Sequence, residues 1–371
     1  KELSFIAEEE LNAVFTNKKI DDELRGFKTP YEAKVKLTED MQLKTVETLV
    51  EEVNKKTYIL NDFYKAKAKI LKLKILTSAD TRHTLPINSL GIDFKFSNCV
   101  EMLSNLFYDF DKEAGNLLVN MVKDKRIDVK PREGKTGGAF QWSMHGNPSF
   151  VLLNHTDSYN SCSTLAHEMG HAIHSYFAEK NQNILNSDYN FTTAETASTF
   201  FESIFYDHIF NQVKTKEQKI QLLHNKIQDK VGTIFRQIMQ FNYLLDLHTQ
   251  FREKGYLSAD QMAQMLVKHY QKDIDPKIVR VDDTTGHFFV YWSHLRSHFY
   301  SFQYSMGELV SSVMFNKYKK DKNFSKNIIN FFSTGGNGTT EDIYKAMDID
   351  VTKRSFYKQG LKSVEDDIIL L

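Results

Sequence analysis

Residues that break regular structure are scarce in this sequence, and their scarcity constrains the fold more than any other feature. Only five of the 371 residues are proline, and residues 31–85 include neither proline nor glycine. Within that stretch Val46, Leu49, Val53 and Leu60 recur at helical spacing, with Glu and Lys between them. Because glycine and proline are the strongest breakers, we predict a mainly helical protein, with one long helix or two in this stretch.

Three further segments show helix signals. Thr215 and Gln218 fit a capping box, and Gly255 can end the helix that they begin. Ser258 and Gln261 fit a second capping box, and residues 353–371 also have a helical pattern.

Residues 131–153 differ from the rest because they are rich in glycine and proline. Two short candidate strands lie there, 138–142 and 149–153, which we interpret as a small antiparallel sheet. We expect this change in composition to divide the chain into a helical region, 1–130, and a catalytic region, 131–371.

The composition excludes several classes of protein. Lys and Arg number 48, as do Asp and Glu, and this balance argues against a general nucleic-acid binder. No apolar run approaches the ~18 residues that span a membrane. With only two cysteines and no apolar signal region at residues 1–4, we expect a cytoplasmic protein without a disulfide scaffold. Residue 1 is not Met, so the sequence can be part of a longer chain.

The strongest chemical signal is His167-Glu168-Met169-Gly170-His171, in a segment with a helical pattern from residue 161 to 176. Residues four apart share one face of a helix, so the two imidazoles can bind one zinc ion. Glu168 lies beside them, where it can take a proton from the water that the zinc activates. Gly170 costs helix stability, which is easier to explain if another backbone comes close.

A catalytic zinc site needs a third protein ligand. Glu179 lies two turns past His171 on the same helix, roughly 12 Å away, and is too far along it. Asp188, in a polar loop, remains a candidate. Glu195 and Glu202 share a face of a further helix, 193–211, with Thr192 or Thr193 as its N-cap. One of the two acids can bind the zinc while the other orients a histidine.

His174 shares the face of the two histidines, one turn beyond His171. We expect it to pack or to support the site rather than to bind the metal.

These residues resemble the M3 zinc peptidases of the thimet-oligopeptidase clan, and within it the oligoendopeptidase F branch. The resemblance rests on His167–Ser175 together with Ala194–Phe200, where the family has its third ligand. It extends to three other stretches, at 138–154, 292–307 and 333–336. It implies one zinc per chain, bound by His167, His171 and Glu195, with Glu202 behind them, and a helical catalytic region with a small sheet beside the metal-binding helix.

The resemblance also implies a mechanism, the hydrolysis of internal bonds in short peptides. Glu168 activates the water and later passes the proton to the leaving amine. The oxyanion needs a second donor besides the zinc, for which Tyr304 is the first candidate, with Tyr300 and His294 as helpers. The family histidine fits either His294, which keeps the spacing to Gly307, or His298, which keeps the local His-Phe-Tyr string. We prefer His294, because spacing along a helix fixes which residues face the zinc.

A substrate site is expected on the first candidate strand. An exposed strand edge can pair with an extended peptide, and Gly137 and Gly138 would permit close approach, followed by Ala139 and Phe140. The alternative is a plain hairpin in the core.

Two other functions stay open. Family members are longer at the N-terminus, so the chain could be a weak or inactive relative that still binds zinc and peptide. It could also be a zinc carboxypeptidase or dipeptidyl carboxypeptidase, for which Arg296 is a candidate anchor of the substrate carboxylate. Retention of Glu168 argues against the inactive relative, since a structural site needs no base.

Overall fold

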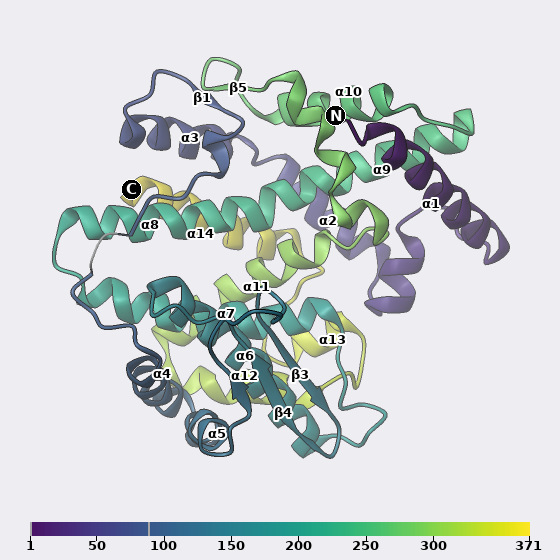
Figure 1. Ribbon diagram of the computed structural model, residues 1–371. Helices are drawn as coiled ribbons and strands as arrows, with labels where there is room; N and C mark the ends of the chain where they lie inside the picture. The colour runs from purple at the N-terminus through teal and green to yellow at the C-terminus, as the bar shows by residue number, and fades with distance from the viewer. Residues whose placement is uncertain (1, 88–89) are drawn as a thin grey trace. The chain divides into compact units, whose positions relative to one another are not determined.

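A computed structural model describes residues 2–87 and 90–371. It is mainly helical with a few short strands, which confirms the expected fold class (Figure 1). The α-helices are α1 (Ser4–Leu24), α2 (Leu43–Asn54), α3 (Tyr58–Leu71), α4 (Phe96–Phe110), α5 (Lys112–Lys123), α6 (Tyr159–Asn181), α7 (Phe191–Gln212), α8 (Lys216–Lys230), α9 (Gln237–Lys254), α10 (Ala259–Asp273), α11 (Phe302–Lys320), α12 (Ser325–Thr334), α13 (Thr340–Lys345) and α14 (Arg354–Leu370). The strands are β1 (Leu76–Thr77), β2 (Ile127–Asp128), β3 (Phe140–Met144), β4 (Asn147–Leu152) and β5 (Val279–Arg280).

The chain forms two compact units, each assembled from separate segments. Unit 1 comprises Lys1–Leu85, Leu223–Met306 and Thr352–Leu371, and unit 2 comprises Pro86–Leu222 and Gly307–Val351. The predicted division into a helical region, 1–130, and a catalytic region, 131–371, stays a prediction.

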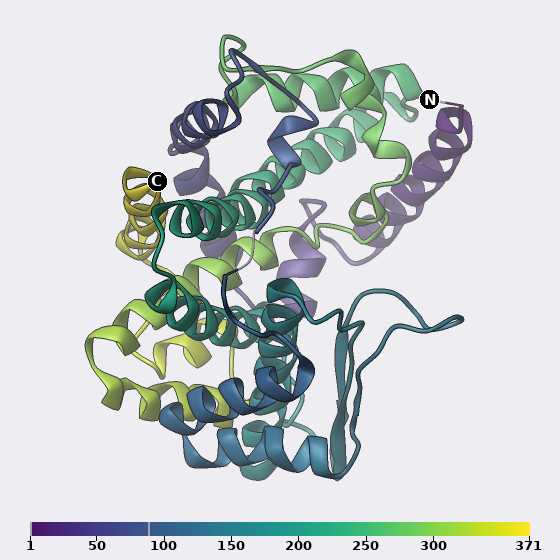
Figure 2. The ribbon, with the colours of Figure 1, turned by 60° about the vertical axis from the view of Figure 1, so that its left-hand side comes forward.

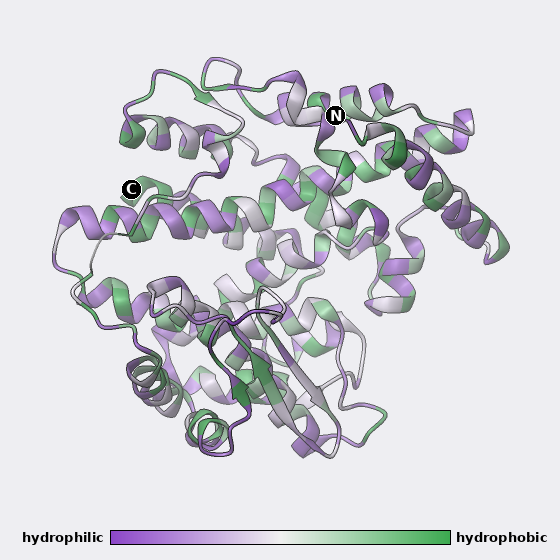
Figure 3. Ribbon diagram, viewed as in Figure 1, coloured by the Kyte–Doolittle hydropathy of each residue, from purple (hydrophilic) through white to green (hydrophobic). Residues whose placement is uncertain are grey.

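Several helices begin and end where the sequence predicts. Both capping boxes form, at Thr215 at the start of α8 and at Ser258 before α10. Gly255 ends α9 with φ +78°. The stretch without breakers holds two helices, α2 and α3, rather than one. Hydrophilic and hydrophobic colours alternate along most helices in Figure 3, as expected of amphipathic helices.

A π-helical turn, Val231–Arg236, joins α8 to α9. Such a turn leaves backbone carbonyls without their usual partners, and the Ser305 hydroxyl donates to two of them, Thr233 O and Ile234 O, at 3.1 Å each. The run from α8 to α9 is therefore one helical rod with a local bulge. None of the helices among the described residues combines the length and the hydrophobicity that a membrane span needs.

Unit 2 contains a three-stranded sheet in the order β2-β4-β3. The antiparallel pair β3–β4 confirms the predicted hairpin, with Phe140 opposite Leu152. The third strand, β2, pairs parallel to β4, so the sheet is mixed rather than purely antiparallel. β3 and β4 pack against α6, and Figure 2 shows the strands edge-on along one side of the helices of this unit. β3 lies at the edge of the sheet and its residues are partly or fully exposed, so it is not a core hairpin.

Helices α6 and α7 cross at close range at the centre of unit 2. A Cβ atom on Gly170 would lie 2.6 Å from Ser198 Cα and 2.9 Å from Ala197 O. Gly170 therefore permits a close contact between the two helix backbones. The sequence suggested such a contact, because a glycine within a helix lowers helix stability. Around the crossing, edge-to-face rings of Phe110, Phe200 and Phe201 fill the core.

The loop between α6 and α7 is fastened by the turn after α12. The Gly336 N–H donates to Asn186 O at 2.9 Å, and the Gln182 side chain donates to Ser333 O at 2.8 Å. A Cβ on Gly335 or Gly336 would lie within 2.5 Å of a loop carbonyl oxygen. We name the segment Ser333–Gly336 the clasp. It fixes the point at which the chain enters α7.

The segment before α11 differs from the prediction. We expected a helix through His294 and Gly307, but Ser293–Arg296 is a short 3-10 turn and α11 begins only at Phe302. Between them His298 and Phe299 adopt left-handed φ of 45° and 63°. Burial of the Phe299 ring against Tyr31 and Phe241 holds this conformation. Because no continuous helix joins His294 to Gly307, helical spacing does not favour His294 over His298.

Candidate metal centre

Helix α6 carries the two histidines of the motif on one face. Its N-cap is Ser158, whose hydroxyl accepts the Ser161 N–H at 3.2 Å. The rings of His167 and His171 are 4.9 Å apart between centroids, as expected for residues one turn apart. Neither ring is fully buried, so the face is open to a ligand.

Glu195 completes a set of three potential ligands. It lies in the second turn of α7, which begins after Asn190, whose side chain accepts the Thr193 N–H. Asn190 is thus the N-cap rather than Thr192 or Thr193. The Glu195 carboxylate lies 3.8 Å from His167 Nε2 and 4.0 Å from His171 Nε2.

One potential ligand atom from each of these three residues lies within 4.8 Å of the others. Two imidazole nitrogens and a carboxylate oxygen at such distances match the donor set of a catalytic zinc site. Gly307 packs closely against Glu195, because a Cβ at Gly307 would lie 3.1 Å from Glu195 Cβ. The residues fit a zinc ion, and their role as ligands stays a prediction.

Glu202 lies on the other side of His167. Its carboxylate is 3.5 Å from His167 Nδ1, and Glu195 faces Nε2 of the same ring. Burial would lower the pKa of His167, but Glu202 first and then the other carboxylates raise it to about 9. An acid beside Nδ1 fixes the ring and leaves Nε2 for a metal.

Glu168 is buried, with 5% of its surface exposed. Burial and the neighbouring acids raise its pKa to about 7, while His167 and the Gln141 N–H, which donates to the carboxylate, lower it. Strand β3 thus holds the predicted base in place through its backbone.

Among the described residues, Asp188 and His174 do not belong to the set of three potential ligands. Asp188 is exposed in the loop before α7, where its carboxylate accepts the Tyr189 N–H. His174 is fully buried and stacks on Tyr189 at 3.7 Å between centroids. Burial lowers the pKa of His174 to about 3, and among the described residues its ring nitrogens have no hydrogen-bond partner. It packs as a neutral ring.

The predicted catalytic aromatics form a cluster in unit 1. The Tyr300 and Tyr304 rings are 5.3 Å apart between centroids, and His294 lies 5.6 and 5.9 Å from them. His298 faces His248 at 6.3 Å instead. The structure thus groups His294 with both tyrosines, although not by the helical spacing that we used. Their action at the metal stays a prediction.

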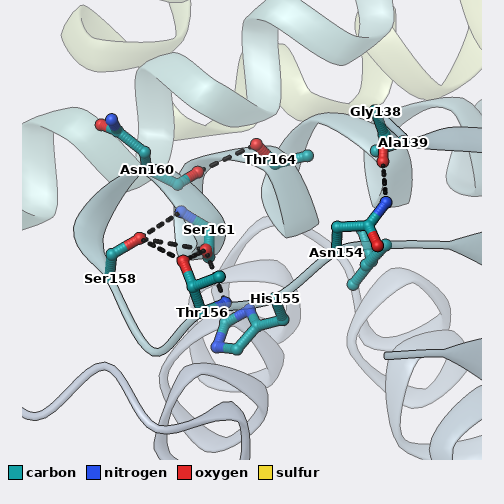
Figure 4. A pocket seen from close by; sticks show the side chains of 10 residues that line it. Gly138, Ala139, Asn154, His155, Thr156, Ser158, Asn160, Ser161 and Thr164 are labelled. Carbon is teal, nitrogen blue, oxygen red and sulfur yellow. Dashed lines mark hydrogen bonds between the residues drawn. The ribbon is translucent and has the colours of Figure 1, made fainter. Parts of the chain in front are cut away.

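A hollow of about 390 Å³ lies at the start of α6 and includes Gly138 and Ala139 (Figure 4). The Asn154 amide donates to Gly138 O at 2.8 Å, and the hydroxyls of Thr156, Ser158 and Ser161 bond one another. Gly138 has φ +79° and a Cβ on it would meet open space, as would a Cβ on Gly137. The first candidate strand thus starts two residues later than predicted, and Gly138 is required by its backbone conformation.

A larger pocket of about 670 Å³ is lined by His171 and Glu195 together with β3 and the loop before α7. Its wall includes Ser175, whose hydroxyl bonds Tyr189 Oη at 2.7 Å and Ser143 Oγ at 3.0 Å. We missed Ser175 in the sequence, although its position one turn after His171 places it on the same face.

Known proteins resemble this chain in sequence and in fold. A sequence model described as Peptidase family M3 matches residues 11–363. Oligopeptidase PepF of Bacillus subtilis (strain 168) is 24% identical over 87% of the chain and 48% of its own length. An oligoendopeptidase F homolog of Borreliella burgdorferi is 28% identical over 84% of the chain and 53% of its own length. The chain thus spans about half the length of these relatives.

A solved structure has the same fold. The crystal structure of oligoendopeptidase-F from Enterococcus faecium superposes with a TM-score of 0.71 at 18% identity, over 100% of this chain and 61% of that one. The match of the sequence model to nearly the whole chain confirms the resemblance seen in the motifs: this chain belongs to peptidase family M3.

Proposed function

We propose that the chain is the catalytic region of a zinc-dependent endopeptidase that hydrolyses internal bonds of short peptides in the cytoplasm. One observation carries the proposal. Donor atoms of His167, His171 and Glu195 converge within 4.8 Å beside the buried carboxylate of Glu168. A purely structural zinc site is closed by four protein ligands and needs no base, whereas three ligands leave a position open.

His167, His171 and Glu195 would hold one zinc ion per chain. When bound, zinc supplies Lewis acidity, which acidifies a water molecule and polarises a carbonyl group. Glu202 orients His167 through Nδ1, and Ser198 donates to the Glu195 carboxylate at 3.3 Å. These contacts keep the donor atoms turned toward one point.

Glu168 acts as the general base. Its buried carboxylate has a pKa near neutrality in the metal-free protein, which suits a group that accepts a proton and then releases it to the leaving amine. The Gln141 N–H holds the carboxylate in place.

The edge strand β3 receives the substrate. Its outer edge has no strand partner among the described residues, and an extended peptide can pair there with little regard to its side chains. Gly137, Gly138, Ala139 and Phe140 form the start of this edge. We assign oxyanion stabilisation to Tyr304, with Tyr300 and His294 beside it.

The contacts of Arg296 weigh against a carboxypeptidase. Its guanidinium donates two hydrogen bonds to the Glu10 carboxylate and three to backbone carbonyl oxygens. All five donors are engaged, so Arg296 has none left for a substrate carboxylate.

The test is Glu168→Gln, with cleavage of an internally quenched, C-terminally amidated peptide as the assay. We expect one zinc per chain in both proteins, and a cleavage rate lower by about 10²–10⁴ in the variant because the amide cannot accept the proton. The amidated end excludes carboxypeptidase action. Glu101→Gln, an exposed acid on α4, is the matched control and should cleave normally. Cleavage by Glu168→Gln at the normal rate would refute the mechanism.

A further inference from the structure

The 670 Å³ pocket shares two of its lining residues, His171 and Glu195, with the predicted metal site. A cavity that opens directly on the reacting centre is where a substrate side chain next to the scissile bond would lie. The chemistry of its remaining walls therefore indicates which side chain it accepts.

One face of α6 forms the floor of the pocket. His171, Ser175 and Glu179 are spaced four residues apart, and all three line it. Glu179 lies eight residues after His171, about 12 Å along the helix axis at ~1.5 Å per residue. The lean of side chains toward the N-terminus is the same for both residues, so the carboxylate stays about 12 Å from the His171 ring along the axis. An extended lysine or arginine side chain covers ~7 Å of this distance, given bonds of about 1.5 Å, and the substrate backbone and the hydrogen bond to Glu179 cover the remaining ~5 Å.

Glu179 is partly buried, and among the described residues it forms no ion pair or hydrogen bond. Burial raises its pKa, and only the nearby ring of His145 opposes this. The lining residues also include Asp188 but no lysine or arginine. A carboxylate in such surroundings gains most from a cation that the substrate brings.

Apolar side chains surround the approach to Glu179. Trp142, Met144 and Ile184 line the pocket and are 62%, 54% and 67% exposed. Lysine and arginine have an apolar stem and a charged head, so these residues can cover the stem while Glu179 binds the head. Trp142 can also contact the cation through its ring face.

We infer, on the basis of the proposed peptidase function, that this pocket selects substrates with lysine or arginine next to the scissile bond. Glu179 recognises the charge, and Asp188 adds to the negative potential. Neither residue takes part in the chemistry.

Two quenched peptides that differ only by lysine or norleucine at one position test the inference. Norleucine keeps the stem and removes the charge. We expect wild-type kcat/KM to favour lysine, with mass spectrometry placing the cut beside it. Glu179→Gln should lower the lysine-to-norleucine ratio by about 10- to 100-fold, as expected for a lost charged hydrogen bond. Glu179→Lys should invert the preference toward norleucine, because two ammonium groups repel each other, and Glu101→Gln should leave the ratio unchanged.

Binding separates this inference from the proposed function. Fluorescence anisotropy with Glu168→Gln measures the affinity for the same two peptide sequences, each carrying the fluorophore without the quencher, in the absence of hydrolysis. A lysine preference that disappears in Glu168→Gln/Glu179→Gln supports the pocket even if the wild type cleaves neither peptide, a result that would refute only the peptidase function. Equal ratios in wild type and Glu179→Gln, by cleavage or by binding, would overturn the inference.

Discussion

Replacing Gly170 by Ala tests whether the crossing of α6 and α7 positions the predicted metal site. The added Cβ would lie 2.6 Å from Ser198 Cα, whereas ordinary contact begins at 3.4 Å. The atom that it meets belongs to the backbone of α7 and cannot rotate away. The two helices must therefore separate by about 0.8 Å, the difference between these distances.

Two opposing effects set the change in stability that we expect from Gly170→Ala. Overpacking a core costs ~1–3 kcal/mol, while alanine gains ~1 kcal/mol of helix propensity over glycine. The free energy of unfolding should thus fall by only ~0–2 kcal/mol. Zinc affinity should respond more clearly, because Glu195 lies one turn before Ser198 and moves with it. Displacing supports of a metal site typically costs about 10- to 100-fold in affinity.

The assay is competition for zinc with a chromophoric chelator, combined with thermal unfolding. Gly232→Ala is the matched control, since a Cβ at Gly232 meets no atom within 4 Å. It should stabilise the protein by up to ~1 kcal/mol and leave zinc affinity unchanged. Equal zinc affinities in the two variants would show that close approach at Gly170 does not position Glu195.

Three other predictions follow from the site and from unit 1. Glu195→Gln should lower zinc affinity measured by elemental analysis and titration, and unchanged binding would favour Asp188 or Glu202 as the third ligand. Tyr304→Phe should lower kcat by about 10²–10³ with little change in KM, and a loss in Tyr300→Phe instead would exchange their roles. Burial lowers the pKa of Lys67 to about 7 from 10.5, so the unfolded state binds the extra proton between these values and stability rises with pH. Urea unfolding should show a gain of ~2–3 kcal/mol from pH 7 to 9 relative to Lys67→Met, and parallel curves would contradict it.

Local patterns predicted the paired histidines and several helix ends, because their signals lie within a few residues. The paired histidines, both capping boxes and the glycine that ends α9 depend on spacing within one or two turns. Gly170 also signalled a close backbone, since a glycine within a helix needs a reason.

Features that depend on tertiary packing could not be predicted from the sequence. Nothing local distinguishes His298 and Phe299 as left-handed residues; burial of the Phe299 ring by distant aromatic residues holds them. We excluded Glu179 as a ligand because it lies about 12 Å along α6. The same distance places it at the reach of a substrate side chain, which became visible only with the pocket. The roles of Tyr304 and Glu195 stay predictions.

The clasp has a consequence for the order of folding. Residues 333–336 hold the loop that leads into α7, and they lie about 150 residues later in the chain than the loop itself. Contacts of such sequence separation form late, because a long segment must be ordered before they can close. During synthesis, which proceeds from the N-terminus, both histidines leave the ribosome long before the clasp does. The nascent chain therefore carries the predicted metal-binding helix while the entrance to α7 is not yet held in place, and Glu195 reaches its final position only after residues 333–336 have been synthesised.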